Sequence, residues 1–185
     1  MIRKFKQLSR QEVDTNVIFK YCKDQVELPD GRVEEYIACI HKGASAVVPV
    51  LPDGRILMVR QYRYAIGRAT IEIPAGGRDG TDEPFEAAAK RELEEETGYT
   101  TDTPLEHLIT IATAIAYCDE MIEVYVAKDL RKTRQHLDPD EFIEIEPFEV
   151  KDLVDMIYAG RIQDSKTIAS IMSYFHKYCV TGHNH

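Results

Sequence analysis

The chain has 185 residues, and its 32 acidic and 23 basic side chains give it a formal net charge of −9. An acidic chain of this kind is a poor candidate for a nucleic-acid-binding protein, because binding to phosphates draws on Lys and Arg. A hydrophobic fraction of 44% supports one folded domain with a proper core and argues against a disordered chain.

The first residues are charged, and no apolar stretch of a secretory signal follows them. The longest apolar run, around Ile109 to Cys118, is about half the length that a membrane-spanning helix needs, and we interpret it as a buried strand. Cys22, Cys39, Cys118 and Cys179 lie far apart without a CxxC pair, which is typical of reduced core thiols. We therefore expect a cytoplasmic protein without a membrane span.

The first half of the chain has the pattern of β-strands. Two β-rich runs within residues 17–40 flank a Pro-Asp-Gly turn and predict a hairpin. The runs 46–51 and 56–62 repeat this pattern around a second Pro-Asp-Gly turn, and residues 69–73 predict a further strand.

The second half alternates helices and strands. Pro84 predicts the start of a helix as its first residue, and Gly98 predicts its end. Strands are expected over residues 108–116 and 121–127, and two amphipathic helices follow, the first of which ends at Gly160. This order predicts an α/β fold in which helices cover a mixed sheet.

Six glutamates crowd the segment from Glu83 to Gly98, which contains the helix expected from Pro84. At about 100° per residue, three of them share the inward side with Phe85 and two alanines: Glu92, Glu95 and Glu96. Like charges at this spacing repel, and a low-dielectric interior makes the repulsion worse unless a cation neutralises them. Without His or Cys ligands nearby, the cation predicted is Mg²⁺, with Mn²⁺ possible. The alternative is a solvated acidic face, which we expect for Glu94 on the opposite side.

A glycine-rich loop, residues 73–80, precedes this helix. The loop and the helix together contain a motif with fixed spacing. The pattern is G-x5-E-x7-R-E-U-x-E-E-x-G-U, where U is bulky and apolar or aromatic. Its nine fixed positions are filled by Gly77, Glu83, Arg91, Glu92, Leu93, Glu95, Glu96, Gly98 and Tyr99. The sequence therefore resembles the Nudix hydrolases, and a match of this length is specific.

The resemblance implies a Nudix-type α/β/α sandwich with a mixed sheet. It implies that Glu92 and Glu96 are the main metal ligands, with Glu95 as a further or water-mediated one. The carbonyl of Gly76 is an additional possible ligand. Arg91 and Glu83 are expected to brace the loop and the helix.

Outside this motif, the resemblance narrows to ADP-ribose pyrophosphatases and related nucleoside-diphosphate-sugar hydrolases. Residues 60–64 (Arg-Gln-Tyr-Arg-Tyr), 72–76 and 160–167 carry it. The implied substrate-binding residues are Arg60, Arg63, Glu72, Arg78, Glu120 and Tyr62. The alternative is that the arginines pair with surface carboxylates and the tyrosines pack in the core; Tyr64 and Tyr117 are further candidates for stacking on a base.

Residues 137–144 are similar to the acidic loop that delivers a catalytic glutamate in this group. Glu141 is our first choice for the general base and Asp140 the second, with Glu95 as a further catalytic candidate. Acidic loops of this kind are most often simply solvated, and that alternative stays open.

The expected reaction is Mg²⁺-dependent hydrolysis of ADP-ribose to AMP and ribose 5-phosphate. One departure weakens the preference for this sugar: the Ser-Pro-Gly of ADP-ribose pyrophosphatases is replaced within residues 114–120. Rival substrates are GDP-mannose, NADH, a dinucleoside polyphosphate or an oxidised nucleoside triphosphate. A rival of another class is a catalytically idle domain that senses a nucleotide sugar.

Members of this group are commonly homodimers that exchange N-terminal strands. Residues 1–42 are expected to form a β-rich segment for dimerisation, and residues 43–185 the hydrolase domain.

Overall fold

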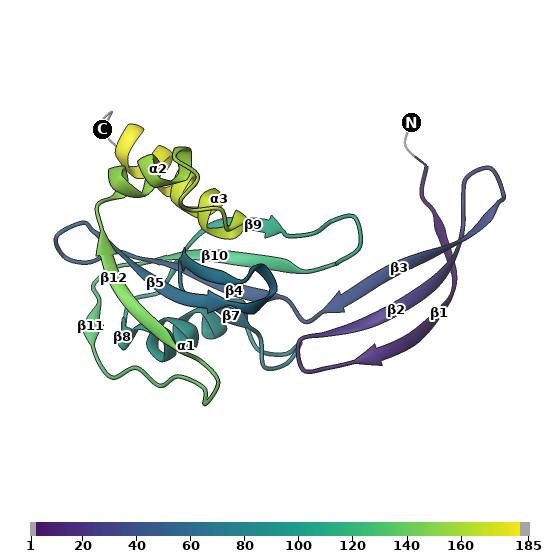
Figure 1. Cartoon of the computed structure of the whole chain (residues 1–185), viewed down its shortest axis with the longest axis horizontal. Helices are drawn as coiled ribbons and strands as arrows, with labels where there is room; N and C mark the ends of the chain where they lie inside the picture. Colours follow the sequence, from purple (N-terminus) through teal and green to yellow (C-terminus); the bar gives the residue numbers. More distant parts are fainter. Residues whose placement is uncertain (1–2, 182–185) are drawn as a thin grey trace.

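The computed structural model describes residues 3–181 and consists of a compact body and an arm that projects from it (Figure 1). The arm is a three-stranded antiparallel sheet in the order β1-β2-β3. Its strands are β1 (Lys6–Thr15), β2 (Phe19–Glu27) and β3 (Val33–His41). The hairpin expected within residues 17–40 is present as β2 and β3. The strand β1 was not predicted individually, because it is polar and exposed along its whole length.

Two larger sheets form the body. The first has the order β7-β4-β10-β9, in which β4 and β10 run parallel and the other pairs are antiparallel. The second has the order β12-β5-β6 and is antiparallel. The strands are β4 (Ala44–Pro49), β5 (Ile56–Arg63), β6 (Arg68–Glu72), β7 (Ala75–Gly77), β9 (Glu106–Ala112), β10 (Met121–Ala127) and β12 (Ile143–Phe148). The short strands β8 (Tyr99–Thr100) and β11 (Arg131–Lys132) pair with each other.

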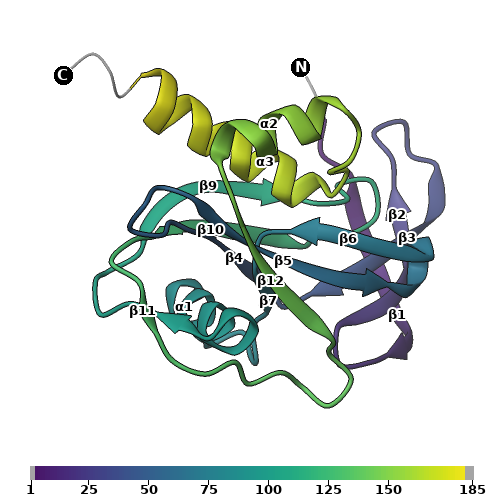
Figure 2. The ribbon, with the colours of Figure 1, turned by 60° about the vertical axis from the view of Figure 1, so that its left-hand side comes forward.

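Helices cover both sides of these sheets, as Figure 2 shows. On one side lies α1 (Phe85–Thr97), and on the other lie α2 (Val150–Tyr158) and α3 (Ser165–Tyr174). Two short helical segments complete the described chain, η1 (Tyr64–Ile66) and η2 (Phe175–Val180). The predicted α/β/α sandwich with a mixed sheet is confirmed.

Two hydrophobic clusters hold the layers together. The larger joins the sheets to α2 and α3 and includes Met58, Val124, Leu153 and Ile171. The smaller lies between α1 and β4 and includes Leu93, which is fully buried. Because β4 is packed from both sides, every one of its residues is buried, which is typical of a central strand in a sandwich.

The predicted pairing of the runs 46–51 and 56–62 is wrong. Both runs form strands, but β4 and β5 lie in different sheets. The antiparallel pairing around the turn is limited to an isolated bridge between Val50, just after β4, and Ile56. The Pro-Asp-Gly turn gave a hairpin signal because it does reverse the chain. The neighbours of β4 are instead β7 and β10, which are distant in sequence and invisible to a local pattern.

Three other expectations need correction. The apolar run 109–118 is not one buried strand: β9 ends at Ala112, and the loop beyond it exposes Ile115 and Tyr117. Among the four free cysteines, Cys22 is buried and the other three are half-buried, so the expectation of core thiols holds fully only for Cys22. Helix α1 begins at Phe85, one residue later than predicted, with Pro84 as its N-cap.

Candidate active site

Helix α1 places two of its glutamates, Glu92 and Glu96, on the side that faces the sheets. The helix ends at Gly98, whose left-handed φ of 66° lets its N–H bond to the Glu94 carbonyl. Its buried residues are Ala88, Ala89, Glu92, Leu93, Glu96 and Thr97. Two carboxylates therefore continue a stripe of core residues. Glu94 and Glu95 are only half-buried.

Burial has a large effect on these two carboxylates. Loss of hydration raises the pKa of Glu96 to about 8 and that of Glu92 to about 7, although Arg91 partly offsets the effect on Glu92. The negative charge of Glu141 adds to the increase at both positions. Without a cation, the interior therefore resists the ionisation of a pair of acids that lie one helical turn apart.

The loop before α1 approaches these carboxylates closely. The Ala75 N–H donates to Glu96 Oε2 at 2.9 Å, and a Cβ atom placed on Gly76 would overlap the Glu92 carboxylate. Only glycine therefore fits at position 76 with this arrangement of Glu92. The loop and the two acids form one unit.

Arg91 ties this unit together. Its guanidinium donates to Glu92 Oε1 at 2.6 Å and to Glu95 Oε2 at 2.9 Å. On its other edge it donates to the Gly77 carbonyl at 2.9 Å and to the Glu83 carboxylate at 3.2 Å. Because these bonds connect both ends of the motif, Arg91 braces the loop against the helix.

Arg78 has a similar bracing geometry. Its guanidinium donates to the carbonyls of Glu83 (2.7 Å), Lys42 (3.0 Å) and Thr81, and it lies 4.3 Å from the centre of the Phe85 ring. Arg78 also borders the cavity described next. Most of its donors are bonded within the loop, which restricts what it can offer to a ligand.

A cavity of about 710 Å³ opens where the loop, the two large sheets and the arm meet. Six of the predicted site positions line it or its rim: Arg63, Gly76, Arg78, Glu96, Glu120 and Glu141. Glu92 lies directly behind Gly76. A volume of this size is within the range of small-molecule sites.

Arg63 reaches the cavity from β5 and is held by a buried acid. Its Nε and Nη2 donate to the two Glu72 oxygens at 2.8 and 2.7 Å, and Lys166 Nζ also bonds to Glu72. Burial alone would raise the pKa of Glu72, but Arg63 and Lys166 lower it to about 2. Glu72 is therefore an ionised anchor for two cations, and it borders a second, neighbouring cavity with them.

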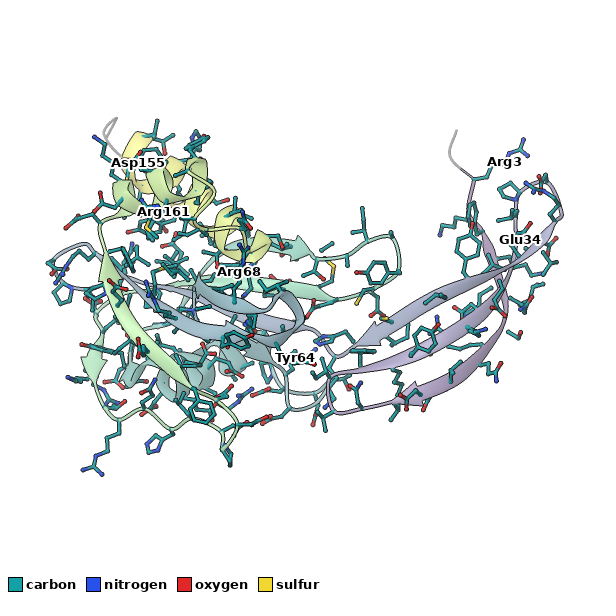
Figure 3. The ribbon with its side chains drawn as sticks, viewed as in Figure 1. Arg3, Glu34, Tyr64, Arg68, Asp155 and Arg161 are labelled. Carbon is teal, nitrogen blue, oxygen red and sulfur yellow. The ribbon has the colours of Figure 1, made fainter. Side chains whose placement is uncertain are left out.

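Side chains alternate between the two faces of β5, and this alternation separates the two predicted arginines. Arg63 faces the 710 Å³ cavity, whereas Arg60 and Tyr62 border a separate depression beside Phe142. Gln61 borders both. Arg60 lies 3.6 Å from Glu146 at the surface, and Tyr62 is 62% exposed. Tyr64, which Figure 3 labels near the junction of body and arm, is 92% exposed. The structure does not bring these three together with Arg63.

Glu141 and Asp140 are neighbours in sequence but differ in position. Glu141 lies just before β12, borders both the main cavity and the depression beside Tyr62, and accepts a bond from the Asp138 N–H at 3.1 Å. Asp140 is exposed and lies outside both. The pairing of β12 with β5 brings Glu141 to the site. This strand was not predicted, because Pro147 interrupts its pattern at an edge position.

Glu120 approaches the cavity from the end of the loop between β9 and β10. Its Oε2 accepts from Thr113 Oγ1 at 2.7 Å, and its Oε1 lies 3.5 Å from His41 Nε2. Tyr117, farther out on the same loop, is 56% exposed and borders a groove along the arm.

Sequence reasoning missed several cavity residues. These are Val17, Ile18, His41, Gln61, Asp164, Ser165 and Lys166. The strand alternation places Gln61 on the same side as Arg63, so this signal was present in the sequence. For Lys166, the signal was the resemblance of residues 160–167 to ADP-ribose pyrophosphatases, which did not indicate a role for any single residue. His41 gave no signal, because its neighbours Asp119 and Glu120 are distant in sequence.

The donor set fits a hard divalent cation. In residues 3–181, no three His, Cys, Asp or Glu side chains form a ready-made coordination group. However, Glu92 and Glu96 present two buried carboxylates beside a loop that excludes a Cβ atom, and nearby Glu141 adds negative charge. Oxygen donors of this kind suit Mg²⁺ or Mn²⁺. Within the same described part of the chain, no helix is long and apolar enough to cross a membrane.

Comparisons with known proteins agree with this geometry. Residues 40–171 match the model of the NUDIX domain. The chain is 36% identical over 168 residues to a methanol dehydrogenase activator of Bacillus methanolicus, and 33% identical over 168 residues to an ADP-ribose pyrophosphatase of Bacillus subtilis. Each alignment covers 90% of both chains.

The fold also matches a solved structure, described as an ADP compounds hydrolase. The TM-score is 0.84 at 19% sequence identity, and the match covers 98% of each chain. At this identity, the likeness bears on the fold alone, and it includes the arm as well as the body.

Proposed function

The chain belongs to the NUDIX family as a pyrophosphohydrolase, and we propose that it hydrolyses the diphosphate bond of a nucleoside diphosphate sugar, foremost ADP-ribose. The observation that carries this proposal is the pair of buried carboxylates, Glu92 and Glu96, behind a glycine-rich loop at a cavity that also contains Arg63. The relative named ADP-ribose pyrophosphatase supports the choice of sugar. The products would be AMP and ribose 5-phosphate.

The acid pair, with Glu95 and the Gly76 carbonyl as further donors, would hold Mg²⁺ or Mn²⁺. Such a cation, when bound, neutralises the diphosphate and makes a water molecule easier to deprotonate. It also accounts for the binding of an anion by a chain with a net charge of −9.

Three residues of the chain have the remaining roles of general base, diphosphate binding and sugar binding. Glu141 is the general base that takes the proton of the attacking water, because it borders the cavity on the side of the acid pair. Arg63, whose side chain is 42% exposed, binds the diphosphate while Glu72 holds its guanidinium in place. Glu120 accepts hydrogen bonds from the hydroxyl groups of the sugar.

The arm is proposed as a dimerisation segment that spans residues 1–42. Support comes from the exposed apolar side chains of β1, including Leu8 (46% exposed) and Val13 (47% exposed), on a thin sheet that the body leaves uncovered (Figure 1). Exposed apolar side chains gathered on a sheet are typical of a surface that binds another protein.

The test is product release from a substrate panel, measured with Mg²⁺ and with EDTA. The panel contains ADP-ribose, GDP-mannose, NADH, diadenosine polyphosphate and 8-oxo-dGTP. We expect metal-dependent turnover with ADP-ribose as the best substrate. A clear preference for another member of the panel would support the proposed hydrolysis but contradict ADP-ribose as the substrate. Binding of a nucleotide sugar without any turnover would favour the sensor instead.

A further inference from the structure

His41 lies at the junction of the arm and the body, as the last residue of β3. Its side chain is only 9% exposed and borders the main cavity. The two ring nitrogens have different partners. Nδ1 accepts a hydrogen bond from the Gly43 N–H at 3.0 Å, and Nε2 lies 3.5 Å from Glu120 Oε1.

The bond from Gly43 determines the tautomer of the ring. A ring nitrogen that accepts a hydrogen bond carries no proton, so the proton of the neutral imidazole must reside on Nε2. The Nε2–H therefore faces the Glu120 carboxylate. Its distance of 3.5 Å is longer than a full hydrogen bond, as is common for functional contacts before a ligand binds.

The backbone keeps the ring in this place. The His41 N–H donates to Asp119 Oδ1 at 2.7 Å, and Cys39 exchanges backbone bonds with Tyr117 (2.6 Å) and Asp119 (3.2 Å). The segment that leaves the arm is thus bonded to the loop that carries Glu120. Neither can move far without the other.

We propose that His41 is a positioning residue that holds the Glu120 carboxylate in the cavity, with Thr113 on the opposite side of that carboxylate. Thr113 donates to Oε2 and His41 faces Oε1, so each carboxylate oxygen has its own partner. The inference rests on the proposed function, in which Glu120 binds the sugar. It adds a residue of the arm to the machinery of the site.

Two substitutions separate the roles of the ring nitrogens. In His41→Asn, the amide oxygen can take the place of Nδ1 and accept from Gly43, but the side chain is too short to reach Glu120. In His41→Gln, the terminal NH₂ can take the place of Nε2 and donate to Glu120, but the acceptor for Gly43 is lost. A role for His41 through Glu120 and a role as a local clamp on Gly43 therefore predict opposite rankings.

The expected result is a change in KM. His41→Asn raises KM for the best substrate about tenfold with little change in kcat, because a bond to a charged group of the site is weakened. His41→Gln stays within about threefold of the wild type. Damage to the fold would instead lower kcat through the fraction of active molecules and leave KM unchanged.

His107 provides a matched control. Its Nε2 lies 2.6 Å from Glu123 Oε2 on the strands β9 and β10, outside the cavity. His107→Asn removes a His–Glu contact of the same kind, and we expect KM to stay at the wild-type value. An equal rise of KM in His41→Asn and His107→Asn would overturn the inference.

A double-mutant cycle with Glu120→Gln completes the test. If His41 acts through Glu120, adding His41→Asn to Glu120→Gln raises KM no further, whereas an independent contribution multiplies the two effects. The same cycle on the melting temperature, measured without substrate, must also be non-additive. The melting temperatures test the contact between His41 and Glu120 even if the wild type turns over no member of the panel. Such a lack of turnover would refute the proposed function but not the contact. Additive effects in both readouts would refute the role of His41.

Discussion

At the scale of single residues, the acid pair of α1 is the most informative feature. Replacing either Glu92 or Glu96 by Gln removes the charge of a proposed metal ligand without changing the size of the side chain. We expect kcat to fall at least about 100-fold in each variant while the fold stays intact. The control is Glu94→Gln on the half-buried side of the same helix, which should keep full activity. Near-normal rates in both ligand variants would contradict the assignment of the metal site.

The same burial predicts a pH effect on the metal-free protein. Burial raises the pKa of Glu96 to about 8 from about 4.5 in the unfolded chain, so the native state binds more protons between these values. The free energy of unfolding in EDTA must therefore decrease as the pH rises from 4.5 to 8. Glu96→Gln should gain roughly 4 kcal/mol over the wild type at pH 8 and almost nothing at pH 4.5. Urea denaturation at the two pH values measures both differences.

Glu72 predicts the opposite slope. Although it is buried, Arg63 and Lys166 hold its pKa at about 2, below the unfolded value of about 4.5. Its contribution to stability is complete above pH 4.5 and is lost as the pH falls towards 2. Glu72→Gln should cost about 3 kcal/mol at neutral pH, because it leaves two cations near the interior without their partner.

The matched control for Glu72 is Glu146, whose carboxylate lies 3.6 Å from Arg60 at the surface. Exposed pairs of this kind contribute little, so Glu146→Gln should cost less than about 0.5 kcal/mol. If chemical denaturation gives equal losses for the two variants, the network around Glu72 does not anchor Arg63 as described.

At the scale of elements, β12 and the loop before it decide which acid can act as the base. Glu141 borders the cavity and Asp140 does not. We expect Glu141→Gln to lower kcat by about 10² or more with a small change in KM, as for the loss of a general base. Asp140→Asn is the neighbouring control and should keep kcat within about twofold. The reverse ranking would transfer the role of the base to Asp140.

The elements also show what a single sequence can predict. Helix α1 and its end at Gly98 could be predicted because they depend on the local sequence. The sandwich could be predicted because the spaced motif is specific to one family of folds. The separation of β4 from β5 and the position of β12 could not be predicted, because they depend on pairing between distant segments. The same reason explains the candidate site: Glu92 and Glu96 came from one helix, whereas the contact of His41 with Glu120 joins residues far apart in the chain.

At the scale of the whole molecule, the arm predicts self-association. Val13→Asp places a charge at an exposed apolar position of β1, and we expect it to convert a homodimer into a monomer. The control is Val180→Asp, because Val180 is similarly exposed, at 51%, on the C-terminal side of the body. Light scattering after gel filtration gives the mass of each variant. A wild type that is monomeric at micromolar concentration would contradict the proposal.

The separation of β4 and β5 has a mechanical consequence. Ala44 and Gly76 line the cavity from one sheet, whereas Gln61 and Arg63 line it from the other. An isolated bridge joins Val50, just after β4, to Ile56 at the start of β5, and Val47 N–H bonds to the carbonyl of Pro74, just after β6. Two separately hydrogen-bonded sheets can shear past each other as rigid bodies on the microsecond to millisecond timescale. Such a shear changes the width between the acid pair and Arg63 without breaking a ladder of either sheet. The tight turn at residues 51–55 joins the ends of β4 and β5, so it would have to bend with any such movement.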